Sequence, residues 1–163
     1  MQLSAYSDYA IRVLMQTALC RPERTTVAEV AETFGISRHH LVKVVHDLGR
    51  HGYLATQRGI GGGFMLARAP EAIRLGDIVR LGEESDTVID CHESKHRFCR
   101  LLPACQLKGI LDEAAGAFFE TLDRHTLADL IRQPSRMRAA LGICRTQTTA
   151  PSRRRYSGAE YEI

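Results

Sequence analysis

Three cysteines close together are the residues best suited to chemistry in this chain. They are Cys91, Cys99 and Cys105, in the segment CHESKHRFCRLLPAC. Thiolates bind zinc ions and iron–sulfur clusters strongly. Structural zinc sites usually contain C-x2-C pairs, whereas the gaps here are seven and five residues, which favours a larger multi-iron centre. His92 and His96 lie inside the segment and keep a zinc site of three cysteines and one histidine open as an alternative.

Three cysteine ligands leave one iron of a four-iron cluster open to an oxygen, a nitrogen or an external molecule. A small ligand such as nitric oxide could attack at that iron. The remaining cysteines, Cys20 and Cys144, stand apart and are interpreted as a helix-face cysteine and a tail cysteine. A disulfide framework is not expected, because the number of cysteines is odd and the chain carries no secretory signal pattern.

A second set of residues could contact DNA. The segments TTVAEVAETFGIS and SRHHLVKVVHDLGRHGYL predict two short helices joined by a turn at Gly35, the pattern of a helix-turn-helix. The first residues of the second helix in such a motif face base edges in the major groove. Here these residues are Arg38, His39 and His40, and we expect Lys43, one turn further on, to bind phosphate.

A glycine-rich hairpin is predicted directly after these helices. Residues 53–57 and 64–67 are expected to form its strands, and the stretch RGIGGG its tip. Arg58 could enter the minor groove while Gly61 lets the backbone approach the DNA, and Arg68 could hold a phosphate. The alternative for each charge is a solvated surface residue, within a generic three-helix domain that carries a hairpin.

Other helices must position both sets of residues. A first helix is expected over about residues 5–20, with Ser7 as its N-cap and Asp8 in its first turn. Short helices are expected at 75–81 and 125–131. A longer helix at about 107–122 has an apolar stripe that could be a dimer surface or an ordinary core face.

The fold class predicted is mainly α, with a winged helix-turn-helix DNA-binding domain, a cysteine-bearing cluster loop and a long C-terminal dimerisation helix. The expected domain bounds are 1–82 for the winged helix, 83–106 for the cluster-binding loop, 107–143 for the dimerisation helix region and 144–163 for a disordered tail.

Composition limits the class of protein. The chain has 163 residues, of which 44% are hydrophobic and 25% charged, enough for one domain with a real core. No apolar run approaches the roughly 18–20 residues that span a bilayer, so we expect no membrane association and a cytoplasmic protein. The net charge of +3 comes from 19 arginines and 3 lysines against 19 acidic residues, which by itself is weak support for nucleic-acid binding. No C-x-x-C motif or nucleophile–base pair is present, and an enzyme is not expected.

Several segments together resemble a family of iron–sulfur winged-helix regulators that includes IscR and RirA. The resemblance covers roughly residues 1–143 and depends on MQLSAYSDYAIRVLM, on GISRHHLVKVVHDLGRHGYL, on RGIGGGFMLARAPEAIRLGDIVR, on the cysteine segment ending in PACQLK, and on FFETLDRHTLADLI. These segments are highly specific for the family and fairly specific for its nitric-oxide-sensing repressors. Such repressors act as homodimers on a pseudo-palindromic double-stranded DNA operator.

The resemblance implies that Cys91, Cys99 and Cys105 hold a 4Fe–4S cluster, with Asp8 from the partner subunit as the oxygen ligand. Nitrosylation of the cluster would lower operator affinity and derepress genes for nitric oxide stress or denitrification. A 2Fe–2S site like that of IscR would need a histidine where this chain has Leu107. An iron- or redox-responsive regulator of the same family remains an alternative, because the seven-residue gap is closer to that branch. A zinc-stabilised structural or interaction module is the alternative from another class.

Overall fold

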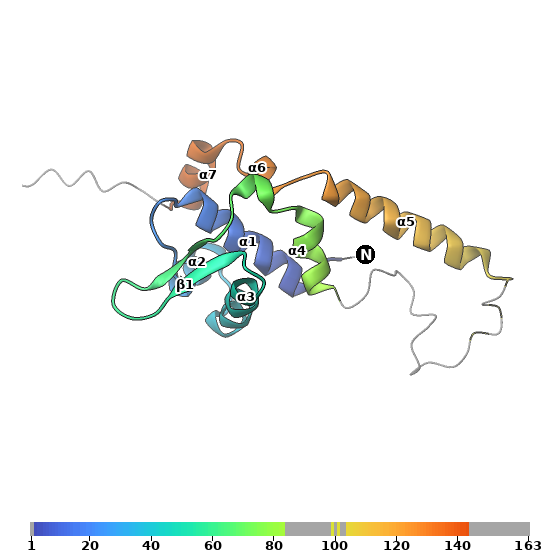
Figure 1. Ribbon diagram of the computed structural model, residues 1–163, viewed down its shortest axis with the longest axis horizontal. Coiled ribbons are helices and arrows are strands. Elements are labelled where there is room, and N and C mark those ends of the chain that lie inside the picture. Colours follow the sequence, from blue (N-terminus) through green and yellow to red (C-terminus); the bar gives the residue numbers. More distant parts are fainter. Residues whose placement is uncertain (1, 84–98, 100, 102–103, 144–163) are drawn as a thin grey trace, which may run out of the picture.

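The computed structural model describes residues 2–83, 99, 101 and 104–143 (Figure 1). Its elements in chain order are α1 (Ala5–Leu19), α2 (Val27–Phe34), α3 (Arg38–Arg50), β1 (Leu54–Gln57), β2 (Gly63–Leu66), η1 (Pro70–Ala72), α4 (Leu75–Gly82), α5 (Gln106–Asp123), α6 (Leu127–Leu130) and α7 (Pro134–Leu141). Most predicted elements are confirmed. The cluster-binding loop, apart from a few residues, and the predicted disordered tail lie outside the described residues.

Helix α1 is the central helix of the fold. Ser4 is its N-cap, and the Ser4 hydroxyl accepts a hydrogen bond from the Ser7 backbone N–H at 3.1 Å. The prediction that Ser7 caps the helix is therefore wrong. Ser7 lies one turn inside α1 and is fully buried against the end of α4. There its hydroxyl is within hydrogen-bond distance of the Val79 carbonyl oxygen and of Glu83 Oε1.

Helices α2 and α3 form the predicted helix-turn-helix. Thr26 and Glu29 make a capping box at the start of α2, and Gly35 ends it in the left-handed region at φ 65°. Such a φ favours glycine, which explains the turn at this position. The buried faces of the helices share one core, formed by Val13, Leu14, Val30, Leu41, Val44 and Leu48 among others.

The predicted hairpin is the two-stranded antiparallel sheet β1–β2. Leu54 pairs with Leu66 and Gln57 with Gly63. Phe64 also pairs with Thr25, outside the strands, through backbone N–H to O distances of 2.8 and 2.9 Å. A Cβ on Gly63 would come within 2.6 Å of the Thr25 carbonyl oxygen, so the hairpin can approach this loop only with glycine there.

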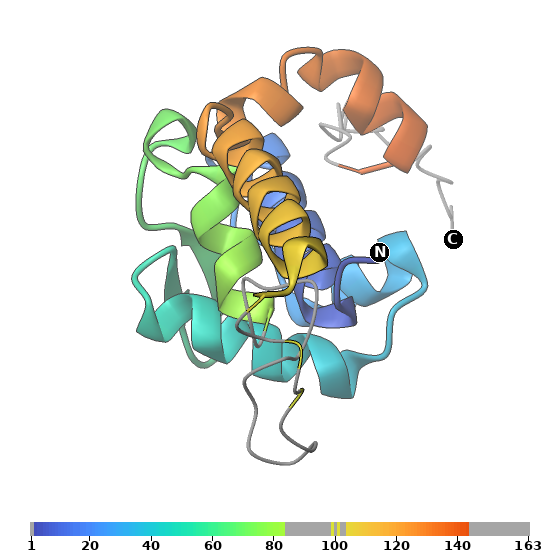
Figure 2. The same cartoon turned by 90° about the vertical axis from the view of Figure 1, so that its right-hand side faces the viewer.

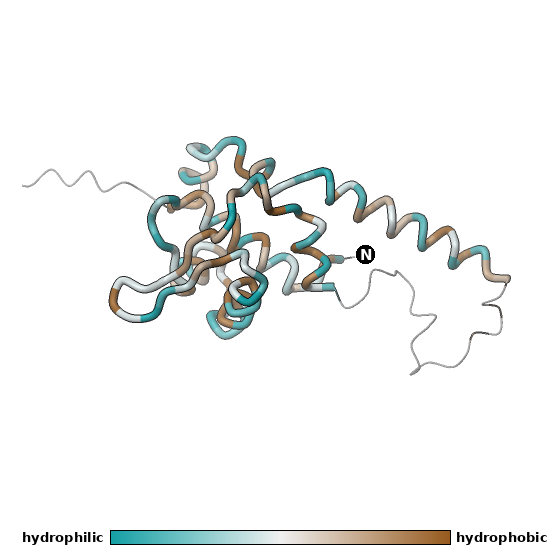
Figure 3. Tube along the Cα trace, viewed as in Figure 1, coloured by the Kyte–Doolittle hydropathy of each residue, from teal (hydrophilic) through white to brown (hydrophobic). Residues whose placement is uncertain are grey.

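Helix α5 extends away from the rest of the described fold (Figure 1), and Figure 2 shows it from its N-terminal end, in front of α1. Its C-terminal end is fixed to α4, where Arg80 donates two hydrogen bonds to Asp123, at 2.7 and 2.8 Å, and lies over the Phe119 ring. Of the residues of α5, only Ala115 and Phe119 are buried. Leu107 and Ile110 are 58% and 61% exposed, so the described chain leaves much of the apolar stripe uncovered, and hydrophobic and hydrophilic segments alternate along α5 in Figure 3.

The last described helix, α7, was not expected from the sequence. Pro134 begins it and Gly142, at φ 65°, ends it. It is attached to α1 by a hydrogen bond of 2.7 Å from Arg138 Nε to the Leu19 carbonyl oxygen. Among the described residues, no helix combines the length and the apolar character needed to cross a membrane.

Candidate nucleic-acid interface and metal centre

The predicted recognition residues lie together at the start of α3. Arg38, His39, His40 and Lys43 are all exposed, while the opposite face of α3 is buried in the core. The His40 ring stacks on Tyr9 of α1 at 6.2 Å between centroids, and His39 lies edge-on to His40. The helix therefore presents two cationic side chains and two imidazoles, of which His40 is also held by α1.

The wing, which is the β1–β2 hairpin, presents the second set of residues predicted to contact DNA. Arg58 and Gly61 are exposed at its tip, next to Ile60, whose side chain is completely exposed. Arg68 lies at the base instead, where it donates a 2.9 Å hydrogen bond to the His51 carbonyl oxygen and lies 4.6 Å from the centre of the Tyr53 ring. These contacts hold the end of α3 against the hairpin, so Arg68 has a positioning role whether or not it binds phosphate.

Two substitutions on α3 should separate base recognition from phosphate binding. We expect Arg38→Ala to cost about 1–3 kcal/mol on the best DNA site and to relax specificity at one base pair. Lys43→Ala should weaken all sequences about equally and reduce the salt slope of binding by about 1. Binding titrations over a DNA library at several salt concentrations measure both effects. Arg136→Ala, on α7, is the control, and equal loss of sequence preference in Arg38→Ala and Lys43→Ala would contradict the assignment.

Two of the three predicted cysteine ligands are described. Cys99 is an exposed free thiol, and Cys105 is a half-buried free thiol at the N-cap of α5. Cys91, His92 and His96 lie outside the described residues. Within the described part of the chain, no group of three or more histidine, cysteine or acidic side chains could hold a metal ion. The thiols present are soft ligands that suit iron–sulfur or zinc chemistry.

Asp8 lies in the first turn of α1, with its side chain 45% exposed. Arg12 Nε donates to its two carboxylate oxygens at 2.8 and 2.9 Å, and both side chains remain over 40% exposed. The Arg12 guanidinium also lies 5.4 Å from the centre of the Phe34 ring in α2. Asp8 and Arg12 line a surface hollow of about 540 Å³ together with Gln2, Leu3, Ala5 and Tyr9. Asp8 is thus accessible from outside and connected to the helix-turn-helix.

A hydrogen-bonded junction lies one turn away, where α1 meets the end of α4. Glu83 Oε1 accepts hydrogen bonds from the Ser4 backbone N–H at 2.9 Å and from the Ser7 hydroxyl at 2.7 Å. The Ser4 hydroxyl donates to the Gly82 carbonyl oxygen at 2.9 Å. A Cβ on Gly82 would overlap Ser7 and Tyr6, so the two helices touch closely here. This junction fixes the point at which the chain leaves α4 toward the cysteine segment.

The junction should be sensitive to pH. Burial by itself would raise the pKa of Glu83, but the donors on Ser4 and Ser7 outweigh it and leave the pKa lowered. Stabilisation by Glu83 is therefore present above its unfolded pKa and is lost as the pH falls through the lower folded pKa. We expect Glu83→Gln to cost about 1–2 kcal/mol of unfolding free energy at pH 7 and less at an acid pH below the folded pKa of Glu83. Urea unfolding at both pH values measures this, with the exposed Glu71→Gln as control, and a cost that does not change with pH would contradict it.

Sequence reasoning missed several of these partners. The spacing of Asp8 and Arg12, four residues apart on one helix, was a signal for their ion pair. Nothing local indicates the Ser4–Ser7–Glu83 junction, because its partners are 76 to 79 residues apart. Cys20, expected on the face of the first helix, is the C-cap residue of α1, where its backbone N–H donates to the Gln16 carbonyl oxygen at 3.0 Å.

The chain is similar to known regulators over most of its length. It is 41% identical to the HTH-type transcriptional regulator NsrR of Bacillus subtilis, over 81% of this chain and 91% of that protein. It is 42% identical to NsrR of Geobacillus kaustophilus, over 86% of this chain and 97% of the relative. These relatives are named as transcriptional regulators, which confirms the prediction that the chain is not an enzyme.

Solved structures agree with this similarity. CymR, the global cysteine regulator of B. subtilis, matches with a TM-score of 0.65 and 27% identity, over 81% of this chain and 97% of its own. IscR of T. potens matches with a TM-score of 0.63 and 25% identity, over 81% and 87%. The predicted winged-helix fold is thereby confirmed.

The Rrf2 family model, described as an iron-dependent transcriptional regulator, matches residues 3–133. The exposed recognition helix, the glycine-tipped wing and these similarities agree, and the chain belongs to the Rrf2 family of DNA-binding transcriptional regulators.

Proposed function

We propose that the chain is a transcriptional repressor that senses nitric oxide through a 4Fe–4S cluster. In this proposal the cluster is held by Cys91, Cys99 and Cys105 of one subunit and by Asp8 of the partner subunit. The protein releases its operator when nitric oxide reacts with the cluster. The observation that supports it best is that Cys99 and Cys105 are free thiols, the second at the N-cap of α5, in a chain 41% identical to an NsrR.

The donor set suits the proposed group. Cys99 and Cys105 supply thiolate sulfur, and the first backbone N–H groups of α5 have no partners within their own helix, so they favour a negatively charged centre nearby. Asp8 is an accessible oxygen donor, although Arg12 now occupies both of its carboxylate oxygens. When bound, the cluster supplies iron that reacts with nitric oxide.

The contacts of Asp8 suggest how the metal centre and the DNA-binding helices are coupled. If Asp8 binds iron, Arg12 shares or loses its carboxylate partner. Arg12 lies over Phe34, at the end of α2, directly before the turn into the recognition helix. Movement of Arg12 would therefore act on the helix-turn-helix through a packed side chain. A packed contact of this kind is one way in which binding at one site can change the affinity at another.

The homodimer part of the proposal is supported by α5. Leu107 and Ile110 are more than half exposed on a helix that extends from the rest of the fold (Figure 1). A second copy packed along α5 would cover them and would place two recognition helices on one pseudo-palindromic operator. The protein would then act in the cytoplasm, where its DNA is found.

Operator binding under anaerobic conditions tests the sensor. We expect nitric oxide to weaken operator binding by at least tenfold, while a ferrous chelator at equal concentration has a smaller effect. In Asp8→Ala the absorption spectrum should change, and the response to nitric oxide should be reduced. Asp77→Ala, with an exposed carboxylate on α4, is the matched control.

The alternatives give different results in the same titration. An iron-responsive regulator would lose operator affinity with the chelator and not with nitric oxide. A zinc-stabilised module would contain zinc, lack visible absorption and bind DNA equally well with or without nitric oxide. Either result would contradict nitric oxide sensing, while DNA binding itself would stand.

A further inference from the structure

The exposed face of the recognition helix α3 contains one apolar side chain. The structure describes this helix in full, and seven of its side chains are exposed: Arg38, His39, His40, Val42, Lys43, His46 and Arg50. All of them except Val42 carry a charge or a hydrogen-bonding group. Val42 is 55% exposed, whereas the other apolar side chains of α3 are at most 8% exposed: Leu41, Val44, Val45 and Leu48. Packing of the core therefore does not explain an apolar residue at position 42.

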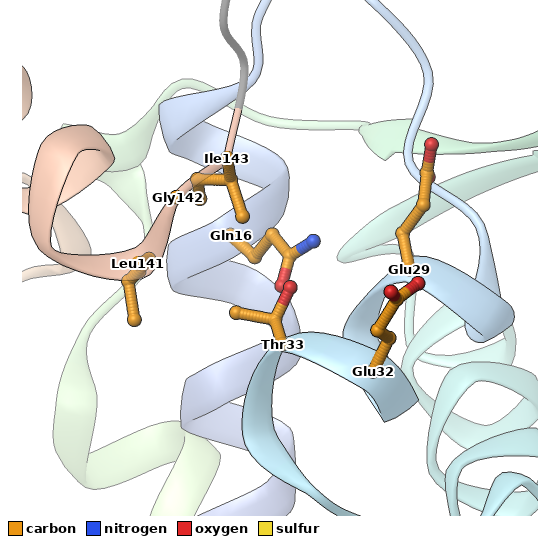
Figure 4. A pocket seen from close by; sticks show the side chains of 7 residues that line it. All are labelled: Gln16, Glu29, Glu32, Thr33, Leu141, Gly142 and Ile143. Atoms are coloured by element: carbon orange, nitrogen blue, oxygen red, sulfur yellow. The ribbon is translucent and has the colours of Figure 1, made fainter.

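The exposed carboxylates of the helix-turn-helix lie elsewhere. Glu29 and Glu32 of α2 line a surface hollow of about 380 Å³ between α1, α2 and the end of α7 (Figure 4). None of the seven exposed side chains of α3 is acidic. The exposed face of α3 can therefore approach the phosphates of DNA without repulsion from carboxylates of its own, and Val42 approaches the DNA with it.

Val42 has polar neighbours along the helix that are suited to reading bases. Arg38 lies four residues before it and His46 four residues after it, and side chains with this spacing are neighbours, about 5–6 Å apart at Cβ. If Arg38 contacts a base edge, Val42 lies in the same groove within about two base pairs, since successive pairs are about 3.4 Å apart. A valine in a helix has essentially one side-chain rotamer, so its two methyl groups are held in place before DNA binds.

We propose that Val42 is a specificity-determining residue that contacts the 5-methyl group of a thymine in the operator. This methyl group is the apolar substituent that base pairs present in the major groove, where the other groups are hydrogen-bond donors and acceptors. A side chain without hydrogen-bonding atoms can recognise only that group. The proposal needs the DNA binding of the family and does not depend on the metal centre.

Replacement of thymine by uracil tests this contact, because uracil differs from thymine only in lacking the 5-methyl group. The site that the anaerobically purified full chain binds most tightly is first selected from a random library of duplex DNA, and each thymine in it is then replaced in turn. We expect one position in each half-site at which uracil weakens binding about three- to fivefold, the effect of one buried methyl group. That position should lie within about two base pairs of the one whose specificity is relaxed in Arg38→Ala.

Two variants show whether Val42 makes the contact. Val42→Ala removes both terminal methyl groups at an exposed helical position, where alanine is the better helix former, so the fold should be retained. We expect this variant to bind the thymine site and the uracil site with nearly equal affinity. Ile60→Ala is the matched control, because it shortens a completely exposed apolar side chain at the tip of the wing. It should leave the preference for thymine over uracil unchanged, whatever it does to the overall affinity.

Cytosine and 5-methylcytosine at the same position give a second measurement of the methyl contact. Both bases change the hydrogen-bonding groups in the same way, so the difference between them reports the methyl group alone. The unchanged protein should prefer 5-methylcytosine, and Val42→Ala should not. If uracil weakens binding at no thymine position, or if the preference for the methyl group persists at full size in Val42→Ala, the proposal is wrong. Loss of the response to nitric oxide would leave it unaffected, since all titrations are made without nitric oxide.

Discussion

Cys105→Ala is expected to abolish the proposed metal centre while leaving the fold intact. Cys105 is a half-buried free thiol at the start of α5, and the described core does not include it. Loss of one of three thiolates should remove iron, sulfide and visible absorption from anaerobically purified protein. If the centre and the DNA-binding helices are coupled by about 1–3 kcal/mol, operator affinity should fall by roughly 5- to 150-fold.

A second substitution at the same position separates ligation from helix capping. Serine is a better N-cap than cysteine, so Cys105→Ser should hold α5 at least as well as the unchanged protein. We nevertheless expect it to lose iron and operator affinity as Cys105→Ala does. Metal and sulfide analysis, far-ultraviolet circular dichroism and operator titration measure these effects. Full iron and sulfide content in both variants would remove Cys105 from the ligand set.

The sequence predicted the DNA-binding half of the molecule well because its signals are local. The period of apolar residues in α2 and α3, the glycine at the turn and the glycine-rich hairpin tip each report on a few neighbouring residues. They therefore predicted the exposed positions of Arg38, Lys43 and Arg58 correctly. Helix α5 was also predicted closely, at about 107–122 against Gln106–Asp123.

Interactions between distant segments could not be predicted in this way. Ser7 has the residue type of an N-cap, and its actual role depends on Glu83, which folding brings to it from 76 residues away. Arg68 has the position of a phosphate contact, yet its guanidinium bonds to His51 and lies over Tyr53. In both cases tertiary packing decides which of several local options a polar side chain takes.

Phe64→Ala should cause the largest loss of stability among the substitutions considered. Phe64 is 2% exposed in β2, and its backbone joins the wing to Thr25 in the loop that precedes α2. Removing a buried phenyl ring costs about 3–5 kcal/mol, against a total stability of about 5–15 kcal/mol for a domain of this kind. The wing would then be held by its short strands, by the backbone pairing with Thr25 and by the Arg68 contacts, and DNA affinity should fall as its orientation loosens.

Met65→Ala is the matched control for this prediction. Met65 follows in the same strand on the opposite face of the hairpin, is only half-buried and pairs with Ala55, so its loss should cost about 1 kcal/mol or less. Urea unfolding at neutral pH compares the two variants directly. If Phe64→Ala were no less stable than Met65→Ala, the ring would not be part of the core that orients the wing. The wing would then depend on its backbone pairing with Thr25 and on the Arg68 contacts instead.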